Sequence, residues 1–313
     1  MKVSVIIVNH NTGKVLEECV RSLNIFEKEG SYEVIIIDNF SNDDSKERIE
    51  KLAESFTNIS AIYTSSLLGF SAANNIGIRT SKGEFVLIMN PDIIFTEPVF
   101  ARLINYLEMN AAAGAISPAL VGTDGNFQRN YFQRFPTIRQ FIYYNSAVAG
   151  LFNKSAGRMN RYLENQDIDI TTGEVYFTEQ LPCAFFFTRR VNMNDAGLMD
   201  ESYQLFFEDV DLSWKIGRNH KLAVDTSLRV THLGGSSFKT ANNWWLYGRY
   251  IYSMMNFFRL HYSKTKLLLL KTLAFTNSIS VIFAEHLKAP LGKKDTYRVS
   301  KHKYLLSLMR GKN

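Results

Sequence analysis

The chain has 313 residues, 46% hydrophobic and 21% charged, which excludes a disordered protein and allows either one large α/β domain or a domain plus an appendage. Its net charge of +6 and isoelectric point near 9.1 predict an anionic partner, either a phosphorylated ligand or an acidic membrane surface. Its two cysteines, Cys19 and Cys183, form neither a zinc spacing nor a disulfide framework, which favours a reducing compartment.

Apolar runs and amphipathic stretches alternate along the first part of the chain. The apolar runs predict strands at residues 3–8, 33–37, 59–63 and 85–89. Helical spacing follows the first run at 14–24, a charged helix follows the second, and a helix start rich in small residues follows the third. This alternation predicts an α/β fold with a mainly parallel, doubly wound sheet. The first run is too short for the apolar core of a signal peptide, so we expect a cytoplasmic location.

Three of the expected strands end in polar side chains. These are Asn9 and Asn11, Asp38 and Ser41, and Asn90 and Asp92. In a doubly wound sheet ligands bind beyond the carboxyl ends of the strands, so we expect the six side chains to share one edge. Neither a GxGxxG motif nor a Walker lysine loop follows the first strand, so a dehydrogenase-like dinucleotide fold is not expected.

The tripeptide Asn90-Pro91-Asp92 has two interpretations. Asn-Pro and Asp favour turns, and the tripeptide then has no further role. Alternatively, a carboxylate at a strand end can hold Mg²⁺ or Mn²⁺ while substrate phosphates and water fill the other coordination positions. Metal dependence would distinguish the two interpretations.

The acidic stretch around Glu208, Asp209 and Asp211 also has two interpretations. Acids in the first turn of a helix are favoured by the helix dipole, and a helix-like pattern follows here. Alternatively, carboxylates next to apolar and aromatic side chains have raised pKa values, as a general base near neutral pH requires. We expect Asp211 to face solvent or Arg218.

Six motifs, in their order along the chain, carry a resemblance to a known family. They are VSVIIVNHN, VIIIDNFS, GFSAANN, LIMNPD, FFEDVDLSWK and VTHLGGSS. Together they resemble the family 2 inverting glycosyltransferases of the GT-A fold, and more narrowly the rhamnosyltransferase-like branch that builds bacterial cell-surface polysaccharide. The resemblance implies a catalytic domain at 1–240, with a nucleotide-sugar-binding half at 1–121 and an acceptor and catalytic half at 122–240. Residues 241–313 would form a basic helical extension.

The resemblance also implies residue roles. It assigns donor binding to Asn9, Asn11, Asp38, Ser41, Gly69, Asn74, Asn90 and Asp92. Asp92 would be the direct ligand of Mg²⁺ or Mn²⁺, with His232 completing the coordination, although a lone histidine at a strand end is more often structural. Many family members have an aspartate where this chain has Asn90, so a second protein carboxylate is missing there. Asp209 matches the family's general base, and Glu208 is the alternative.

Residues 122–180 are harder to interpret. A hairpin-like turn at 122–126 is followed by aromatic residues interleaved with arginines. Such interleaving is found in single-stranded nucleic-acid sites, but we expect packing or an acceptor loop here and no nucleic acid. Cys183 stands where the family usually has glycine and is expected to be a buried, inert thiol. Asp200 either orients a sugar hydroxyl or caps a turn.

The chain ends in an aromatic segment, an apolar stretch up to Leu287 and a basic tail. Lys271, Asn277 and Glu285 make the apolar stretch a poor spanning helix. An interfacial amphipathic segment on the inner face of the membrane fits better, and packing on the catalytic domain or on a second subunit is the alternative.

We therefore expect a metal-dependent inverting glycosyltransferase. It would move a rhamnose-like sugar from a dTDP or UDP sugar to a hydroxyl of a glycan or lipid-linked acceptor in cell-surface polysaccharide synthesis. A sugar-phosphate nucleotidyltransferase is one alternative, but it would need a glycine-rich basic loop, which residues 9–13 do not supply. A non-catalytic, membrane-docked scaffold is the other. The joint presence of Asp92, Glu208, Asp209 and His232 argues against that scaffold.

Overall fold

The computed structural model describes residues 2–28, 30–145, 167–234 and 244–311. The chain divides into two compact units. The first unit comprises residues 1–135, 164–202 and 208–239, and the second comprises 136–163, 203–207 and 240–313. The sequence-based boundary at residue 240 stays a prediction.

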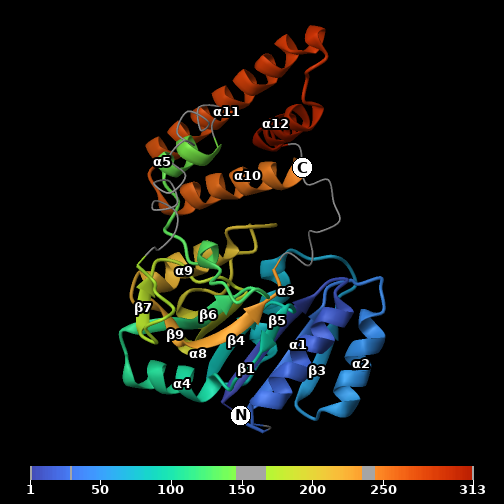
Figure 1. Cartoon of the computed structure of the whole chain (residues 1–313), viewed down its shortest axis with the longest axis vertical. Helices are drawn as coiled ribbons and strands as arrows, with labels where there is room; N and C mark the ends of the chain where they lie inside the picture. Colours follow the sequence, from blue (N-terminus) through green and yellow to red (C-terminus); the bar gives the residue numbers. More distant parts are fainter. Residues whose placement is uncertain (1, 29, 146–166, 235–243, 312–313) are drawn as a thin grey trace. The chain divides into compact units, whose positions relative to one another are not determined.

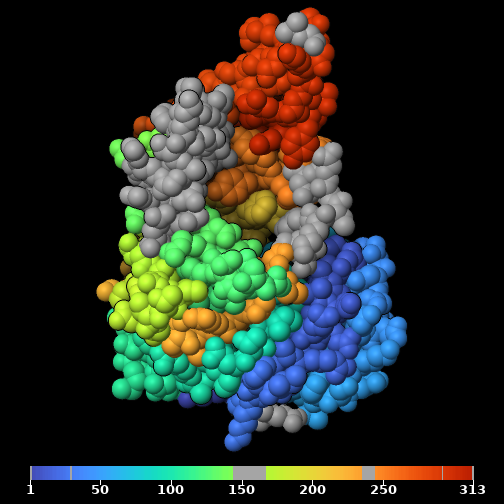
Figure 2. All heavy atoms as spheres, viewed as in Figure 1, coloured from blue at the N-terminus to red at the C-terminus, as the bar shows by residue number. Residues whose placement is uncertain are grey.

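The first unit begins with alternating strands and helices (Figure 1). In chain order they are β1 (Val3–Asn9), α1 (Gly13–Phe26), β2 (Tyr32–Asp38), α2 (Ser45–Ser55), β3 (Ile59–Tyr63), α3 (Phe70–Thr80) and β4 (Phe85–Met89). The four strands are parallel, in the order β3-β2-β1-β4, as the apolar runs predict. Every residue of β1 and β4 is buried, which explains why these strands are continuous apolar runs. The space-filling view shows this part in blue as one continuous surface (Figure 2).

The rest of the first unit adds mixed pairing to the sheet. Its elements are β5 (Ile93–Phe95), α4 (Phe100–Met109), β6 (Ala113–Val121), η1 (Arg129–Tyr131), β7 (Val175–Thr178), β8 (Phe185–Arg189), α8 (Arg190–Asp195), α9 (Glu208–Gly217) and β9 (Lys221–His232). β8 runs antiparallel to β4 and β6, whereas β6 and β9 are parallel. β5 and β7 pair antiparallel with β9. The described residues thus form a nine-stranded sheet in which this half is less parallel than predicted.

Aromatic rings fill the core where β4 meets β8. The rings of Phe85 and Phe187 are stacked with centroids 5.5 Å apart, and Phe100 of α4 stacks on Phe187 at 6.1 Å. Offset stacking adds to the hydrophobic stabilisation of buried rings. The strand that contains Phe187, β8, therefore lies between β4 and β6 and joins the parallel part of the sheet to the mixed part.

The second unit contains a short helix pair and a C-terminal helical bundle. Its elements are α5 (Ile138–Gln140), η2 (Phe141–Asn145), α10 (Trp244–His261), α11 (Lys264–Leu287), η4 (Ala289–Leu291) and α12 (Thr296–Met309). α11 packs against both α10 and α12. Ser263 and Asp295 cap α11 and α12, because their side chains accept hydrogen bonds from the first-turn amides of Lys266 and Arg298.

Helix α11 is more apolar than its polar residues led us to expect. It has 24 residues with a window of mean hydropathy 1.7, which meets the requirement for crossing a membrane by length and composition. Only 28% of that window is buried in the protein. By length and composition alone, α11 is therefore a better candidate than Lys271, Asn277 and Glu285 led us to expect.

Candidate active site

The ends of β1 and β2 hold a preformed cluster of polar side chains. Asn9 Nδ2 donates to Asp38 Oδ1 at 2.8 Å and to Ser41 Oγ at 3.2 Å. Ser41 Oγ donates to Asp38 Oδ1 at 2.6 Å. Asn11 adopts a left-handed φ of 55°. Its backbone N–H donates to Ser41 Oγ at 2.9 Å, and its side-chain Oδ1 accepts from the backbone N–H of Asn42 at 2.8 Å. The structure thus brings together the four side chains that the sequence assigned to the nucleoside.

Asn39, which the sequence analysis did not single out, fixes the neighbouring loop. Its Nδ2 donates to the Leu68 carbonyl and its Oδ1 accepts from the Leu68 amide, both at 2.9 Å. The side chain is buried, so neither bond competes with solvent. These two hydrogen bonds hold the loop that leads into Gly69, the residue that precedes α3.

Asn74 and its neighbour Asn75 differ in what they contact. Asn74 is fully buried, and its Nδ2 donates to the Phe70 carbonyl at 2.9 Å within α3. Asn75 instead bonds the Met199 backbone twice, donating to its carbonyl at 2.9 Å and accepting from its amide at 3.1 Å. Asn75 therefore ties α3 to the loop that precedes α9, a role that the sequence motif did not separate from that of Asn74.

Asp92 and His232 face each other across the β5–β9 ladder, in which Ile93 pairs with His232. Asp92 Oδ1 lies 3.4 Å from His232 Nε2, and both side chains are buried. Gln128 Nε2 donates to the His232 carbonyl at 2.8 Å, which orients the Gln128 amide. Gln128 Oε1 then lies 2.7 Å from His232 Nδ1. An amide oxygen only accepts, so Nδ1 carries a hydrogen, and Nε2 is the ring nitrogen that faces Asp92.

This pair fits a divalent cation. A carboxylate oxygen and an imidazole nitrogen that face each other need a positive charge with them, either a proton or a metal ion, and both groups are common metal ligands. The hydrogen bond from Nδ1 to a fixed acceptor is typical of metal-binding histidines. Within the described residues no third His, Cys, Asp or Glu joins the pair, so further positions would be left for ligand oxygens and water.

Tyr131 connects the Asp92 region to the acidic motif. Its ring meets the His232 ring edge-on, with centroids 4.8 Å apart. Burial raises the pKa of the Tyr131 hydroxyl, and the negative charges of Asp92 and Asp209 raise it further. The backbone also connects the two motifs, because the Asn90 amide donates to the Ala184 carbonyl at 3.2 Å and the adjacent Cys183 amide bonds Asp209. The sequence analysis had placed Tyr131 in a packing or acceptor segment.

A strained turn presents Glu208 and Asp209 at the start of α9. Phe206 and Phe207 have φ values of 66° and 71°, in the left-handed region that aromatic residues rarely adopt. Such conformations cost roughly 1–3 kcal/mol each and persist only where packing holds them. The Phe207 ring packs on Tyr250, with centroids 5.2 Å apart. This packing holds the turn that precedes α9.

Burial dominates the electrostatics of these acids. It raises the pKa of Glu208 to about 8, with a further contribution from the charge of Asp209. It raises the pKa of Asp209 to about 6, against the opposing effect of backbone hydrogen bonds from Val210 and Cys183. Glu208 Oε2 has no hydrogen-bond partner within the described residues. The two raised pKa values leave the pair with about one negative charge near neutral pH, and the helix dipole alone does not explain this arrangement.

Comparison with known proteins agrees with this geometry. Residues 4–173, more than half of the chain, match the family described as glycosyl transferase family 2. The chain belongs to this family. Its fold is that of the GT-A glycosyltransferases. It aligns over nearly its whole length with a mannosyltransferase, PcManGT from Pyrobaculum calidifontis, solved with GDP-Man and Mn²⁺ (TM-score 0.59, 14% identity, 99% of this chain and 86% of that chain). A second structure, GalNAc-T7 with UDP, GalNAc and Mn²⁺, gives a TM-score of 0.60 at 16% identity, covering 99% and 56%.

Relatives by sequence match a shorter stretch of this family 2 chain. Glycosyltransferase GlyG of Streptococcus pneumoniae is 28% identical over 157 residues, which cover 50% of each chain. The poly(ribitol-phosphate) β-N-acetylglucosaminyltransferase TarP of Staphylococcus aureus is 29% identical over 168 residues, which cover 51% of each. The chain thus spans about half the length of these relatives.

Three other predictions for the family 2 domain have definite structural outcomes. Asp211 does not face solvent or Arg218, because it is fully buried and pairs with Lys215 at 2.7 Å, one helical turn away. Asp200 Oδ1 accepts from the Ser202 amide at 2.8 Å, as a turn cap does. Cys183 is buried as expected, and burial raises its thiol pKa well above the usual range.

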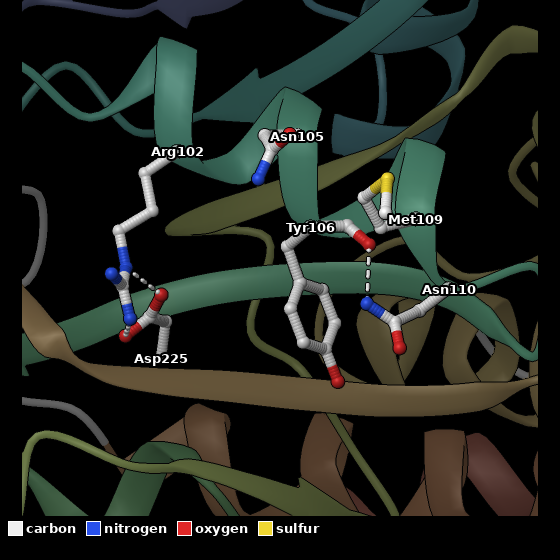
Figure 3. A pocket seen from close by; sticks show the side chains of 6 residues that line it. All are labelled: Arg102, Asn105, Tyr106, Met109, Asn110 and Asp225. Carbon is white, nitrogen blue, oxygen red and sulfur yellow. Dashed lines mark hydrogen bonds and ion pairs between the residues drawn. The ribbon is translucent and has the colours of Figure 1, made fainter.

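A pocket of about 170 Å³ lies elsewhere in the same domain, between α4 and β9 (Figure 3). Arg102 points across it to Asp225, with Nε and Oδ2 2.6 Å apart. Asp225 Oδ1 accepts from both the amide and the hydroxyl of Ser227, at 3.0 and 2.6 Å. The register of β6 and β9 shifts just after Asp225. Both oxygens of Asp225 are therefore engaged, and the Arg102–Asp225 pair ties α4 to the irregularity of β9.

Proposed function

We propose that this chain transfers a sugar from a nucleoside-diphosphate sugar to an acceptor hydroxyl, with inversion at the anomeric carbon. The observation that carries the proposal is the backbone contact between the two motifs: the Asn90 amide donates to the Ala184 carbonyl at 3.2 Å, and the adjacent Cys183 amide bonds Asp209. A group suited to a diphosphate-bound cation and a carboxylate suited to proton transfer thereby share one region. Transfer from an activated donor to an alcohol needs these two functions close together.

The donor is proposed to lie across the strand ends. The cluster of Asn9, Asn11, Asp38 and Ser41 supplies hydrogen-bonding groups for base and ribose, and its internal bonds hold it ready before the ligand arrives. Gly69 and Asn74 at the start of α3, and Asn90 at the end of β4, are proposed as further donor contacts.

Asp92 and His232 are proposed to hold Mg²⁺ or Mn²⁺, which two structural neighbours contain together with a nucleotide or nucleotide sugar. When bound, such a cation neutralises charge on the diphosphate leaving group. Gln128 keeps the lone pair of His232 Nε2 directed at the site. Tyr131 covers the histidine ring and limits its exposure to water.

Asp209 is proposed as the general base. Its pKa of about 6 leaves it ionised at neutral pH yet basic enough to accept a proton from an alcohol in the transition state. The acceptor oxygen attacks the anomeric carbon from the face opposite the diphosphate, its proton passes to Asp209, and the bond to the diphosphate breaks. Glu208, which keeps its own proton, is the alternative base only above pH 8.

The sugar and acceptor are proposed at the level of class. The motif resemblance favours a rhamnose-like donor of the dTDP type, with UDP sugars as the next choice. TarP and a poly(ribitol-phosphate) β-glucosyltransferase of Bacillus spizizenii, 29% identical over 35% of this chain and 18% of its own length, are named for transfer to poly(ribitol-phosphate). These names support a polymeric acceptor, and the acceptor is proposed to be a surface glycan or its lipid-linked precursor, used on the cytoplasmic side.

The test compares Asp209→Asn with wild type and with Asp195→Asn. Asp195 is an exposed acid at the end of α8, so its substitution removes the same charge outside the proposed site. Turnover is followed as nucleoside diphosphate released from dTDP-rhamnose, UDP-glucose and UDP-N-acetylglucosamine with Mn²⁺ and a mixture of lipid-linked and polyol-phosphate acceptors. We expect Asp209→Asn to lose about 10²- to 10⁴-fold in turnover with unchanged donor affinity.

The pH profile provides a second test of the same residue. Because the base acts in its ionised form, wild-type turnover should rise with pH, about tenfold per unit below pH 6, and level off above it. Full turnover in Asp209→Asn, or a profile without this rising limb, would show that Asp209 is not the base.

A further inference from the structure

The charge of the chain is divided unequally along the sequence. Residues 240–313 hold thirteen of the 36 Lys and Arg residues but only two of the 30 Asp and Glu residues, a net charge of +11. Residues 1–239 therefore have a net charge of −5. The anionic partner that the overall charge suggests is thus expected on the C-terminal helices and not on the sheet domain.

Helix α11 presents an apolar stripe to solvent. The stripe consists of Leu268, Leu269, Phe275, Ile279, Phe283 and Leu287, which are between 43% and 65% exposed. At 100° per residue these positions fall within an arc of roughly 120° on one face of the helix. Lys264 and Lys266 precede the stripe, and Lys288, Lys293 and Lys294 follow it. A broad apolar face with cations at both ends is typical of a helix that lies on an anionic lipid surface.

The opposite face of α11 is tied to α12 through polar groups. Glu285 is buried, and its carboxylate pairs with Lys288 at 2.7 Å and Arg298 at 3.2 Å. Ser278 Oγ lies 3.1 Å from Nδ1 of the buried His302. A helix that crossed a bilayer would have to carry Glu285 and its partners toward the hydrocarbon, which is unfavourable. These contacts favour a helix that lies in the plane of the interface with this face turned to the protein.

A pocket of about 220 Å³ opens beside the stripe. Its cations are Arg259 of α10 and Lys271 of α11, and its apolar lining includes Met255, Leu267 and Leu308. Arg259 is held in place by Asn256, whose Oδ1 accepts from its Nε at 3.1 Å and from its terminal nitrogen at 2.7 Å. The two cations suit the phosphate headgroup of a lipid, and the apolar lining suits the adjoining part of its acyl chains.

We propose that the stripe of α11 docks this protein on an anionic phospholipid bilayer, with the helix lying in the interface and lipid phosphate at Arg259 and Lys271. The apolar side chains enter the boundary between headgroups and acyl chains, and the flanking lysines contact the anionic headgroups. Docking places the protein at the surface where a lipid-linked substrate resides. The inference does not rest on the proposed transferase activity, because docking is measured without turnover.

The experiment measures co-sedimentation of the purified full chain with phosphatidylcholine vesicles that contain or lack phosphatidylglycerol. Binding is expected only with phosphatidylglycerol, and it should be lost near 1 M salt, where the Debye length is about 3 Å. Phe283→Ser should weaken the partition constant by at least about tenfold. Lys264→Gln with Lys293→Gln should weaken it about fivefold per removed charge. Arg259→Gln should weaken it to a similar degree.

Matched controls come from the first unit. Ile25→Ser removes an apolar side chain that is 75% exposed on α1, and Lys82→Gln removes an exposed cation. Both should bind like wild type. Equal binding by Phe283→Ser and Ile25→Ser would overturn the proposal. So would resistance to alkaline carbonate extraction, which would show a spanning helix, or a vesicle-independent dimer in sedimentation velocity that Phe283→Ser dissociates.

Discussion

The raised pKa of Glu208 has a measurable consequence for the pH dependence of stability. The folded-state pKa of this carboxyl, about 8, lies above that of an unfolded glutamate, near 4, so the folded state binds its proton more tightly. Stability therefore falls as pH rises from about 4 to about 8. Glu208→Gln removes that dependence, and its melting temperature should exceed that of wild type at pH 8 but not at pH 5.

For a domain of this length, each kcal/mol of added stability should raise the melting temperature by about 2–4 °C. The control is Glu18→Gln, which changes an exposed acid on α1 and should leave the melting temperature unchanged at both pH values. A lower melting temperature for Glu208→Gln at both pH values would mean that the carboxyl makes a stabilising bond in its ionised form.

At the scale of elements, the contact between β4 and β1 allows no side chain at Gly83. A Cβ there would lie 2.6 Å from the Ser4 nitrogen and 2.7 Å from the Val3 carbonyl carbon, both backbone atoms of β1. The Gly83 amide also donates to Ser4 Oγ at 2.7 Å. Gly83→Ala should destabilise the fold by about 1–3 kcal/mol in urea unfolding, because the strands have to separate.

Gly217 provides the matched substitution, since a Cβ at the end of α9 would meet no atom within 4 Å. Gly217→Ala should be neutral or stabilising by up to about 1 kcal/mol, as expected for replacing glycine in a helix. If the two variants unfold at the same urea concentration, close packing of β4 on β1 does not limit stability.

The sequence predicts elements that local residue patterns define, and it misses elements that depend on contacts with distant parts of the chain. The strands at 59–63 and 85–89 were predicted to the residue. β4 is buried throughout and is therefore a continuous apolar run, whereas the edge strand β3 is only partly buried. The convergence of Asn9 and Asp38 followed from parallel strands sharing one edge. The short β5 and β7 were missed, since what defines them is pairing with β9, far away in the chain.

The site residues that were missed or misplaced also depend on contacts that the local sequence does not show. Gln128 was missed because its role depends on His232, 104 residues away, and nothing in the local sequence indicates that contact. Asp211 was misplaced because the pattern of acids at 208–211 does not show which face of α9 is buried. The turn at Phe206 and Phe207 was also missed, since aromatic residues carry no signal for a left-handed backbone.

For the whole molecule, donor binding should appear as stability of the folded chain. A ligand present at 100 times its dissociation constant adds about 2.7 kcal/mol, so UDP or dTDP with Mn²⁺ should raise the melting temperature well above that of the free protein. Without Mn²⁺ the rise should be small, because the diphosphate charge would face the Asp92 carboxylate unneutralised.

Gln128→Leu should reduce the stabilisation by nucleotide and Mn²⁺, although Gln128 is not among the proposed nucleotide contacts. Losing the acceptor at His232 Nδ1 frees the ring and its tautomer, and comparable losses of an outer hydrogen bond weaken metal affinity about 10- to 100-fold. The Mn²⁺ concentration for half-maximal stabilisation should rise by that factor, while Gln133→Leu, whose side chain bonds only the nearby Asn130 carbonyl, should match wild type. Direct Mn²⁺ titration by electron paramagnetic resonance checks the same shift. Equal Mn²⁺ dependence in the two variants would mean that His232 is a structural histidine.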